Sequence, residues 1–145
     1  MSEVAEVQKL LVRSRCAKAL AVRHVVKEDS EPGIDGLKWT TDAEKMEAVL
    51  SLTSKGYHAK PYRKIIINAD GKNRGINIPV CYDKAMQVLY AYSIDPVAES
   101  LADKQSYAFR KGRSIFDAHS YIQRNFSDDR APRYAVRADV RRCYD

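Results

Sequence analysis

Cysteine is scarce in this sequence, and its three copies, Cys16, Cys81 and Cys143, have neither an even number nor the spacing of metal ligands. Both a disulfide scaffold and a zinc module are therefore disfavoured, and a reducing, cytoplasmic environment is expected. Long apolar runs are also absent, since no window approaches the roughly 18 residues of a membrane span. The acidic residues 1–6 lack the apolar stretch of a secretory signal, so no membrane partner is expected.

The chain also lacks internal repeats, low-complexity tracts and a recognisable linker. Its 145 residues correspond to about one domain. Hydrophobic residues make up 45% and charged residues 30%, which is ordinary for a soluble domain that buries a core without cross-links. The three histidines show no metal-ligand spacing, so they are predicted to be structural or exposed.

The formal net charge of +6 is distributed unevenly along the chain. An acidic stretch over 28–47 separates the basic stretch 1–27 from three further basic stretches at 55–74, 104–113 and 130–142, and aromatic residues are interleaved with these. Cations that neutralise phosphates, combined with aromatics that stack on bases, are typical of a nucleic-acid-binding surface. A solvated basic face with its aromatics in the core explains the same composition, so charge alone leaves both interpretations open.

Local signals predict a mixed α/β (α+β) chain. Two capping boxes, in which a hydroxyl and a carboxylate satisfy each other's backbone amides, predict helix starts at Thr41 and Ser114. The turn sequence 69–72 lies between two β-branched runs and predicts a hairpin. Asp95 and Pro96 are expected to cap and restart a helix. The predicted elements are helices over about 3–27 (continuous or broken), 41–55, from 83 with a restart at 95, and 114–126, and strands over 62–68, 76–80 and 134–140.

Four blocks of the sequence carry short motifs, namely Ala21–Arg23 with Gly33–Gly36, Arg63–Pro79 with Asp83–Gln87, Asp95–Glu99 with Ser106–Ser114, and Ala138–Asp145. These blocks occur in the order of known polymerase motifs. In this order and spacing they resemble the N-terminal block, the two finger blocks and polymerase motif A of group II intron reverse transcriptases, or maturases. Asn68–Ala69 stands where the family usually has Pro-Lys, which indicates a divergent member or a CRISPR-associated or diversity-generating reverse transcriptase.

The resemblance implies the fingers subdomain of a right-hand polymerase, mainly helical with a β-hairpin and the first palm strand. Residues 1–132 correspond to the fingers region with its N-terminal extension, and residues 133–145 to the start of the palm, with motif A truncated. The implied partners are RNA (intron or template), an RNA/DNA primer-template and dNTP. A non-catalytic, maturase-type RNA-binding module is the alternative. An unpaired strand at 134–140 would also invite a homodimer.

The motif A resemblance assigns Asp139 as the catalytic carboxylate and the Val140 backbone carbonyl as a second ligand of Mg²⁺. Nucleotidyl transfer uses two metal ions, and Mg²⁺ prefers hard oxygen ligands. Tyr144 would lie under the sugar of the incoming nucleotide. Because one carboxylate cannot hold two metals, these 145 residues alone are expected to be inactive as a polymerase, and whether the chain is an enzyme stays open.

Cations on and beside the predicted hairpin, Lys64, Lys72 and Arg74, are candidates to bind a triphosphate, and Arg74 best matches the family's phosphate-binding arginine. Charged hairpin tips are also common as merely solubilising features. The candidates for nucleic-acid binding are Arg23, Arg63, Arg110 and Arg113. The last two precede a predicted helix start, which suits a phosphate contact, and their pairing with Asp103 or Asp117 is the alternative.

Overall fold

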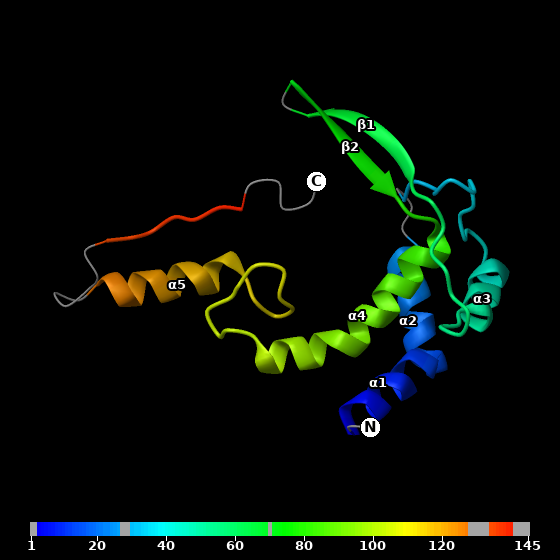
Figure 1. Cartoon of the computed structure of the whole chain (residues 1–145), viewed down its shortest axis with the longest axis horizontal. Helices are drawn as coiled ribbons and strands as arrows, with labels where there is room; N and C mark the ends of the chain where they lie inside the picture. Colours follow the sequence, from blue (N-terminus) through cyan, green and yellow to red (C-terminus); the bar gives the residue numbers. More distant parts are fainter. Residues whose placement is uncertain (1–2, 27–29, 70, 128–133, 141–145) are drawn as a thin grey trace. The chain divides into compact units, whose positions relative to one another are not determined.

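The computed structural model describes residues 3–26, 30–69, 71–127 and 134–140. The chain divides into two units, 1–100 and 101–145, each of which is described by itself. Within the described residues it is an α+β chain with five helices and one two-stranded antiparallel sheet, in the order α1, α2, α3, β1, β2, α4, α5 (Figure 1). The division at 100/101 does not test the predicted boundary between fingers and palm at 132/133, which stays a prediction. None of the described helices is long and apolar enough to cross a membrane.

The predicted N-terminal helix is broken at Ser14 into α1 (Glu3–Arg13) and α2 (Arg15–Val25). Ser14 has extended backbone angles (φ −62°, ψ 128°), and its Oγ accepts a hydrogen bond from the amide of Ala17 at 3.5 Å. Serine favours a new helix start at such a position because its side chain satisfies one of the unpaired amides of the first turn. The buried face of α2 consists of small and branched residues, namely Ala17, Ala21, Val22 and Val25.

The third helix, α3 (Asp42–Ser51), ends earlier than the predicted residue 55 because another side chain closes its C-terminus. The Tyr82 hydroxyl donates a hydrogen bond to the Ser51 carbonyl at 3.0 Å and accepts one from the Thr53 amide at 3.0 Å. Leu52, between these two residues, is completely buried. A tertiary contact therefore sets the end of this helix, whereas local sequence sets its start.

The capping box predicted at Thr41 is confirmed. The amide of Glu44 donates to the Thr41 Oγ1 at 3.2 Å, and the Glu44 carboxylate accepts from the amides of Thr41 and Thr40 at 2.8 Å each. These hydrogen bonds, those from the Thr41 backbone foremost, lower the pKa of Glu44 from its ordinary 4.5 to about 2.

A carboxylate whose pKa is lower in the folded state stabilises the fold above its unfolded pKa, and this contribution is lost as pH falls through the folded pKa. We therefore expect the melting temperature to fall between pH 4.5 and about pH 2, and to fall less steeply in Glu44→Gln. Circular dichroism melts across this range measure the effect. Glu47→Gln, on the same helix but outside the capping box, should retain the wild-type steepness. Identical acid profiles for the wild type and Glu44→Gln would contradict the expectation.

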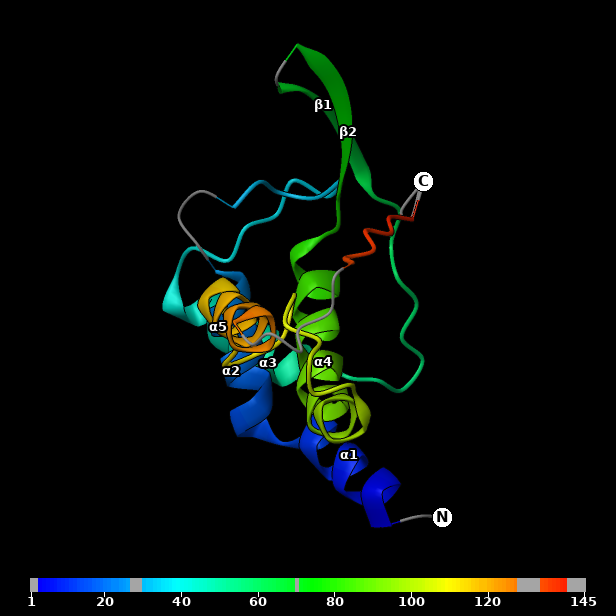
Figure 2. The ribbon, with the colours of Figure 1, turned by 90° about the vertical axis from the view of Figure 1, so that its left-hand side faces the viewer.

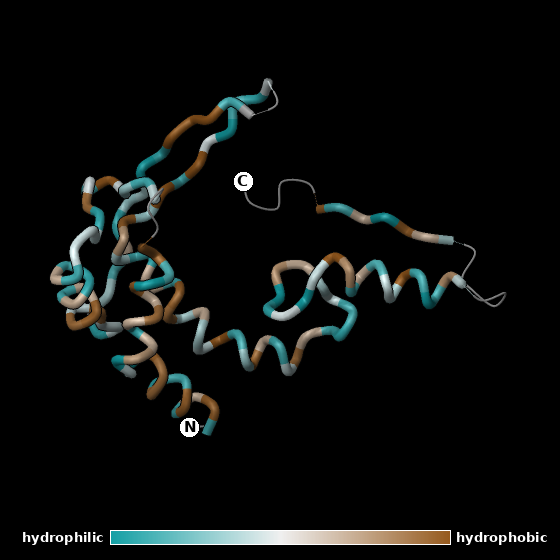
Figure 3. Tube along the Cα trace, turned by 180° about the vertical axis from the view of Figure 1, so that it is seen from behind, coloured by the Kyte–Doolittle hydropathy of each residue, from teal (hydrophilic) through white to brown (hydrophobic). Residues whose placement is uncertain are grey.

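The predicted hairpin is formed by β1 (Arg63–Ala69) and β2 (Lys72–Ile78), which pair antiparallel with Arg63 opposite Ile78. Its turn contains Gly71 in the left-handed conformation (φ 72°), which glycine adopts without strain. The second strand begins before the predicted residue 76 because pairing with β1, and not β-branched content, decides which residues join the ladder. The hairpin extends away from the helices of its unit (Figure 1, Figure 2). Figure 3 shows a hydrophobic middle in β1 and hydrophilic residues toward the hairpin tip.

The core of the first unit is organised by α4 (Cys81–Leu101). Three of its side chains, Ala85, Met86 and Leu89, are completely buried, and they pack in one cluster with the buried faces of α2 and α3. The three recur at spacings of one to four residues, as expected for one face of a helix.

The predicted restart of this helix at Asp95 is wrong, since α4 continues through Pro96 as one helix. Proline has no amide proton, but its φ fits a helix. The pair Asp95-Pro96 is therefore compatible both with a new helix start and with a helix that continues through the proline. Tertiary contacts hold the preceding turn in place. The Gln8 side chain on α1 donates to the Ser93 carbonyl at 3.1 Å, and the Ser93 Oγ donates to the Tyr90 carbonyl at 2.7 Å.

In the second unit, α5 (Ile115–Phe126) begins at the predicted capping box. The Asp117 carboxylate accepts hydrogen bonds from the amide and the hydroxyl of Ser114, both at 2.7 Å. The hydrogen bond from the Ser114 side chain is the main cause that lowers the pKa of Asp117. No residue of α5 is buried, so its apolar stripe finds no core within the described part of this unit.

The strand predicted over 134–140 is not formed. These residues have no regular secondary structure, and Tyr134, Val136 and Val140 are 87%, 93% and 71% exposed. Alternating apolar residues favour an extended backbone, but a strand also needs a partner whose backbone groups complete the ladder. Among the described residues only β1 and β2 pair with each other, and this segment has no such partner.

Candidate nucleic-acid interface

The pairing register divides the hairpin cations between two faces. Side chains alternate along a strand, and directly opposed residues of a pair share a face. Arg74 lies opposite Ile67 and Lys72 lies opposite Ala69, which places both cations on one face. Lys64 precedes Ile67 by three residues, an odd offset, and therefore belongs to the other face. Two of the three predicted nucleotide-binding cations are brought together, and the third is not.

The face that carries Lys72 and Arg74 is accessible. Both residues are exposed, and neither side chain makes a hydrogen bond or ion pair within the part of the chain that the structure describes. Toward the hairpin base the same face continues with isoleucines, of which Ile67 and Ile76 are 39% and 40% exposed. This surface therefore combines two available cations at the tip with an aliphatic patch behind them.

On the opposite face, the Lys64 side chain lies across the hairpin backbone. A Cβ placed on Gly75 would come within 2.9 Å of the Lys64 Cε, so the aliphatic stem of the lysine covers the glycine. Lysine stems commonly cover apolar surface in this way while the charged end stays in water. Lys64 is exposed, but its ammonium group serves a different face from that of Arg74.

Arg63 stands at the base of the hairpin and uses its guanidinium inside the chain. One nitrogen donates to the Pro32 carbonyl at 3.1 Å, and the other pairs with the Glu31 carboxylate at 3.3 Å. Its predicted role in nucleic-acid binding stays a prediction. Arg23 is exposed on α2, at the edge of a groove of about 420 Å³ between α2 and α3, and belongs to a helix rather than to the hairpin.

In the second unit, Arg113 organises the loop that precedes α5. Its guanidinium donates to the carbonyls of Lys104 at 2.8 Å and Ser106 at 2.6 Å, with a longer contact of 3.4 Å to that of Asp103. The carbonyl of Arg110, which is half-buried, accepts from the amide of Arg113 at 3.3 Å. Arg113, which is predicted to contact phosphate, thus holds loop carbonyls in the structure. The spacing of residues in the sequence did not reveal this role.

The predicted motif A residues lie apart from the hairpin cations in the chain and belong to the second unit. Asp139 and Val140 are exposed in the irregular segment 134–140, and Tyr144 lies outside the described residues. No group of three or more His, Cys, Asp or Glu side chains is placed to hold a metal ion within the described ranges. One carboxylate and one carbonyl do not compose a magnesium site, so the described residues do not fit this ion by themselves.

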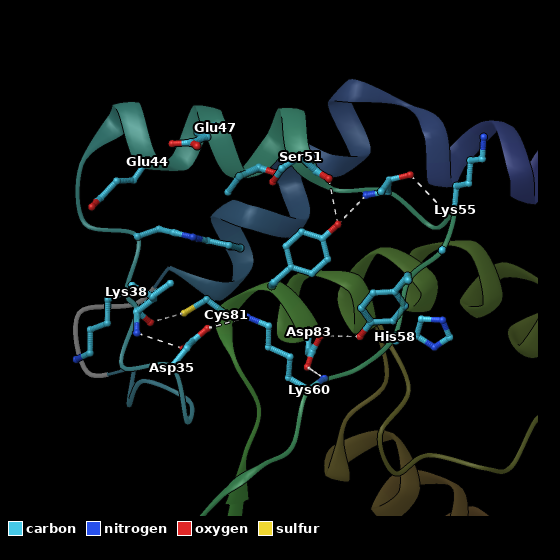
Figure 4. A pocket seen from close by; sticks show the side chains of 17 residues that line it. Asp35, Lys38, Glu44, Glu47, Ser51, Lys55, His58, Lys60, Cys81 and Asp83 are labelled. Carbon is cyan, nitrogen blue, oxygen red and sulfur yellow. Dashed lines mark hydrogen bonds and ion pairs between the residues drawn. The ribbon is translucent and has the colours of Figure 1, made fainter.

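A cavity of about 550 Å³ lies between α3, the segment 52–60 and the start of α4 (Figure 4). Asp83 in its wall is only 2% exposed and accepts hydrogen bonds from the Tyr57 hydroxyl and the Lys60 amide, both at 2.8 Å. Burial, and then the hydrogen bond to Asp83, raise the pKa of Tyr57. Because both donors meet a charged acceptor, this cluster ties the segment 52–60 to α4.

Sequence reasoning missed the role of Asp83, which was interpreted as the opening residue of a helix. The helix begins at Cys81, so Asp83 lies within its first turn. A weak signal was available, because Asp83 precedes the buried Met86 by three residues, and residues three apart lie on one side of a helix. The thiol of Cys81 donates to the Leu37 carbonyl at 3.3 Å, and burial raises its pKa, which disfavours the reactive thiolate.

Residues 1–52, which contain α1, α2 and α3, match the family model described as the N-terminal domain of reverse transcriptase. Maturase-like protein 1 of Euglena gracilis is 26% identical over 129 residues, which are 85% of this chain and 28% of that protein. The group II intron-encoded protein LtrA of Lactococcus lactis subsp. cremoris is 29% identical over 105 residues, 70% of this chain and 17% of the relative. The chain is thus similar to reverse transcriptases in its first 52 residues, and to maturase-like and group II intron-encoded proteins over most of its length.

A further relative is Protein YkfC of Escherichia coli (strain K12), which is 27% identical over 122 residues, 79% of this chain and 32% of the relative. The chain therefore spans about a third or less of the length of each of these relatives. The match to the N-terminal domain ends before the hairpin begins at Arg63. The proposed roles of the hairpin cations thus rest on the residues of this chain itself.

Proposed function

We propose that the chain provides the fingers region of an RNA-directed DNA polymerase of the group II intron type, with residues 1–132 as the fingers and 133–145 as the start of the palm. In the complete enzyme, the hairpin would present Lys72 and Arg74 to phosphates of the RNA template or of the incoming dNTP. The observation that carries this proposal is the pairing register, which places both cations on one exposed face.

Physical chemistry supports phosphate as the ligand of this face. Arginine and lysine form charge-assisted hydrogen bonds with phosphate oxygens, and such contacts stabilise charge that develops on a transferred phosphoryl group. The aliphatic patch behind the two cations offers contact to the apolar parts of a sugar or base. Lys64, Arg23, Arg110, Arg113 and Tyr144 remain proposed contacts of the same polymer or nucleotide. The guanidinium of Arg63 is instead occupied by Glu31 and Pro32.

Asp139 is proposed as one metal-binding carboxylate of the complete active site, with the Val140 carbonyl beside it. Two Mg²⁺ ions require more carboxylates than Asp139 alone. The 145 residues by themselves are accordingly proposed to lack polymerase activity. The exposed segment 134–140 would join a sheet in the complete enzyme, or else pair with a second copy of the chain as a homodimer.

A non-catalytic RNA-binding module is the second candidate function. The observation that favours it is the match of residues 1–52 to a domain whose helices expose cations, including Arg13, Arg15 and Arg23. On this proposal RNA binds along α1 and α2, and the hairpin contributes little. The names of two relatives, a maturase-like protein and a group II intron-encoded protein, favour this lineage over CRISPR-associated or diversity-generating reverse transcriptases.

The two candidates predict opposite results for two charge-matched double variants. We expect Lys72→Ala/Arg74→Ala to weaken binding of a fluorescein-labelled single-stranded RNA by about tenfold, and to reduce the salt slope by about 0.7 for each phosphate that the variant no longer neutralises. Arg13→Ala/Arg15→Ala removes the same charge from α1 and α2 and should have a smaller effect. Fluorescence anisotropy at several salt concentrations measures both quantities.

The same samples separate the remaining outcomes. If the helix variant loses more affinity than the hairpin variant, the RNA-binding-module candidate is favoured over the fingers proposal. If the wild type shows no binding at low salt, both candidates fail. Primer extension on an RNA template, with Mg²⁺ and dNTP, should yield no product from the purified chain, and robust synthesis would contradict the proposed incompleteness of the catalytic site.

A further inference from the structure

The segment 30–36 lies in the corner between the base of the hairpin and the start of α4 (Figure 2). It belongs to the acidic stretch of the sequence, and in the structure it lies beside cations of both neighbouring elements. A turn closed by the hydrogen bond from the Gly36 amide to the Gly33 carbonyl, at 3.2 Å, keeps it compact. This placement links three elements that are separate in the sequence.

Two cations hold the beginning of this segment from opposite sides. From β1, Arg63 donates to the Pro32 carbonyl at 3.1 Å and pairs with the Glu31 carboxylate at 3.3 Å. From α4, the Lys84 Nζ donates to the Glu31 carbonyl at 2.7 Å and to the Ser30 Oγ at 3.2 Å. The hairpin and the helix are therefore joined through consecutive residues of one loop.

The third contact is steric and involves Gly33. A Cβ at this position would lie 2.5 Å from the Cα and 2.6 Å from the nitrogen of Val80, which are backbone atoms that cannot move aside easily. Val80 is completely buried and connects the end of β2 to α4, where its carbonyl accepts the amide of Lys84 at 3.0 Å. The loop thus packs against the junction from which the hairpin projects.

We propose that Arg63, Lys84 and Gly33 form a brace that fixes the direction of the hairpin, so that Arg63 and Lys84 act as positioning residues for the phosphate-binding face rather than as phosphate ligands. The inference rests on the proposed function, because it concerns how Lys72 and Arg74 are presented. An isolated two-stranded hairpin is only marginally stable in water, so one that projects from helices depends on contacts at its base. The brace supplies these contacts.

For Glu31→Ala, the brace and simple electrostatics predict opposite changes in RNA affinity. Removal of the carboxylate that pairs with Arg63 should, on charge alone, strengthen the binding of an anionic polymer. If Glu31 anchors Arg63 in the brace, its removal should instead weaken binding of the fluorescein-labelled single-stranded RNA, by roughly fivefold, within the range for residues that act through a neighbour. Unchanged or stronger binding by Glu31→Ala would overturn the inference.

Gly33→Ala tests the steric contact without any change of charge. We expect weaker RNA binding together with faster hydrogen exchange at the amides of 63–78, since the hairpin base loses its support. Gly56→Ala is the matched control, because an added Cβ there meets no atom within 4 Å, although Gly56 has a positive φ of 67°. Circular dichroism melts verify that each variant is folded before exchange is measured.

The two readouts distinguish failure of the brace from failure of the proposed function. Faster exchange at 63–78 in Glu31→Ala and Gly33→Ala, with no RNA binding by the wild type, would support the brace and refute the function of the hairpin face. RNA binding by the wild type, with exchange and affinity unchanged in both variants, would refute the brace alone. Arg63→Lys, which retains the charge and one donor group, should recover part of the affinity that Arg63→Ala loses.

Discussion

Replacement of Asp83 with alanine is expected to lower the free energy of unfolding by about 3 kcal/mol, because two hydrogen bonds to a buried carboxylate are lost. Asp83 is 2% exposed, and its carboxylate receives the Tyr57 hydroxyl and the Lys60 amide at 2.8 Å each. The alanine side chain can accept neither bond. The loss would thus release this segment from α4.

Urea denaturation followed by far-ultraviolet circular dichroism measures this change. Asp83→Asn keeps one acceptor oxygen in nearly the same volume and should lose less than Asp83→Ala. Asp42→Ala is the control for removal of an exposed aspartate, which pairs only with Lys45 on the surface, and it should change the free energy little. A loss in Asp83→Ala no larger than that in the control would show that the buried hydrogen bonds contribute nothing.

The same cluster predicts an alkaline loss of stability. Burial, followed by the hydrogen bond to Asp83, raises the pKa of Tyr57 above its ordinary value of 10.0. Because the pKa of Tyr57 is higher in the folded state than in the unfolded state, its neutral hydroxyl stabilises the fold fully below the unfolded pKa. This stabilisation is lost as pH rises through the folded pKa. Urea midpoints should therefore decline above about pH 10, and less steeply in Tyr57→Phe. An equal decline in both proteins would exclude Tyr57 as the cause.

Leu89→Ala is expected to lower the free energy of unfolding by about 3 kcal/mol, within the usual range for a leucine truncated in a packed core. Leu89 is completely buried on α4, in the cluster that α4 forms with α2 and α3. The cost combines the lost transfer of the side chain from water with the cavity that remains. Because this cluster is the hydrophobic core of the first unit, the whole unit should unfold at lower urea concentration.

The helix offers a matched control for this substitution. Leu101, at the other end of α4, is 81% exposed, so Leu101→Ala removes the same atoms from the same helix without opening a cavity. Its effect should stay within about 0.5 kcal/mol. Equal losses in the two variants would show that helix propensity, rather than burial, determines the cost. A lower urea midpoint at unchanged m is the expected signature of Leu89→Ala.

Features set by neighbouring residues were predicted well from the sequence. The capping boxes at Thr41 and Ser114 satisfy amides within three residues, so their geometry depends only on the local chain. The hairpin turn at 69–72 is equally local, because its glycine supplies the left-handed conformation. The resemblance to group II intron reverse transcriptases likewise came from the order of short motifs. These inferences needed no knowledge of which segments meet in space.

The candidate site was predicted less completely, because its geometry depends on pairing and packing. Lys64 and Arg74 are grouped by chain proximity, yet the register places them on opposite faces of the hairpin. Arg63 carries the charge of a phosphate ligand, but Glu31 and Pro32, about thirty positions away in the sequence, occupy its guanidinium. The assignments of Asp139 and Tyr144 stay predictions, the first in an irregular segment and the second outside the described residues.

Composition, caps, turn and motif order by themselves determined the α+β class of this chain, the starts of α3 and α5 and the existence of the hairpin. Only the tertiary structure decided that α4 runs through Pro96, that Asp83 is a buried acceptor, and that 134–140 stays unpaired. The physical reason is the same in each case. Caps and turns are satisfied by residues next to them in the chain, whereas a strand partner, a buried hydrogen bond or a supported proline depends on atoms that only folding brings close.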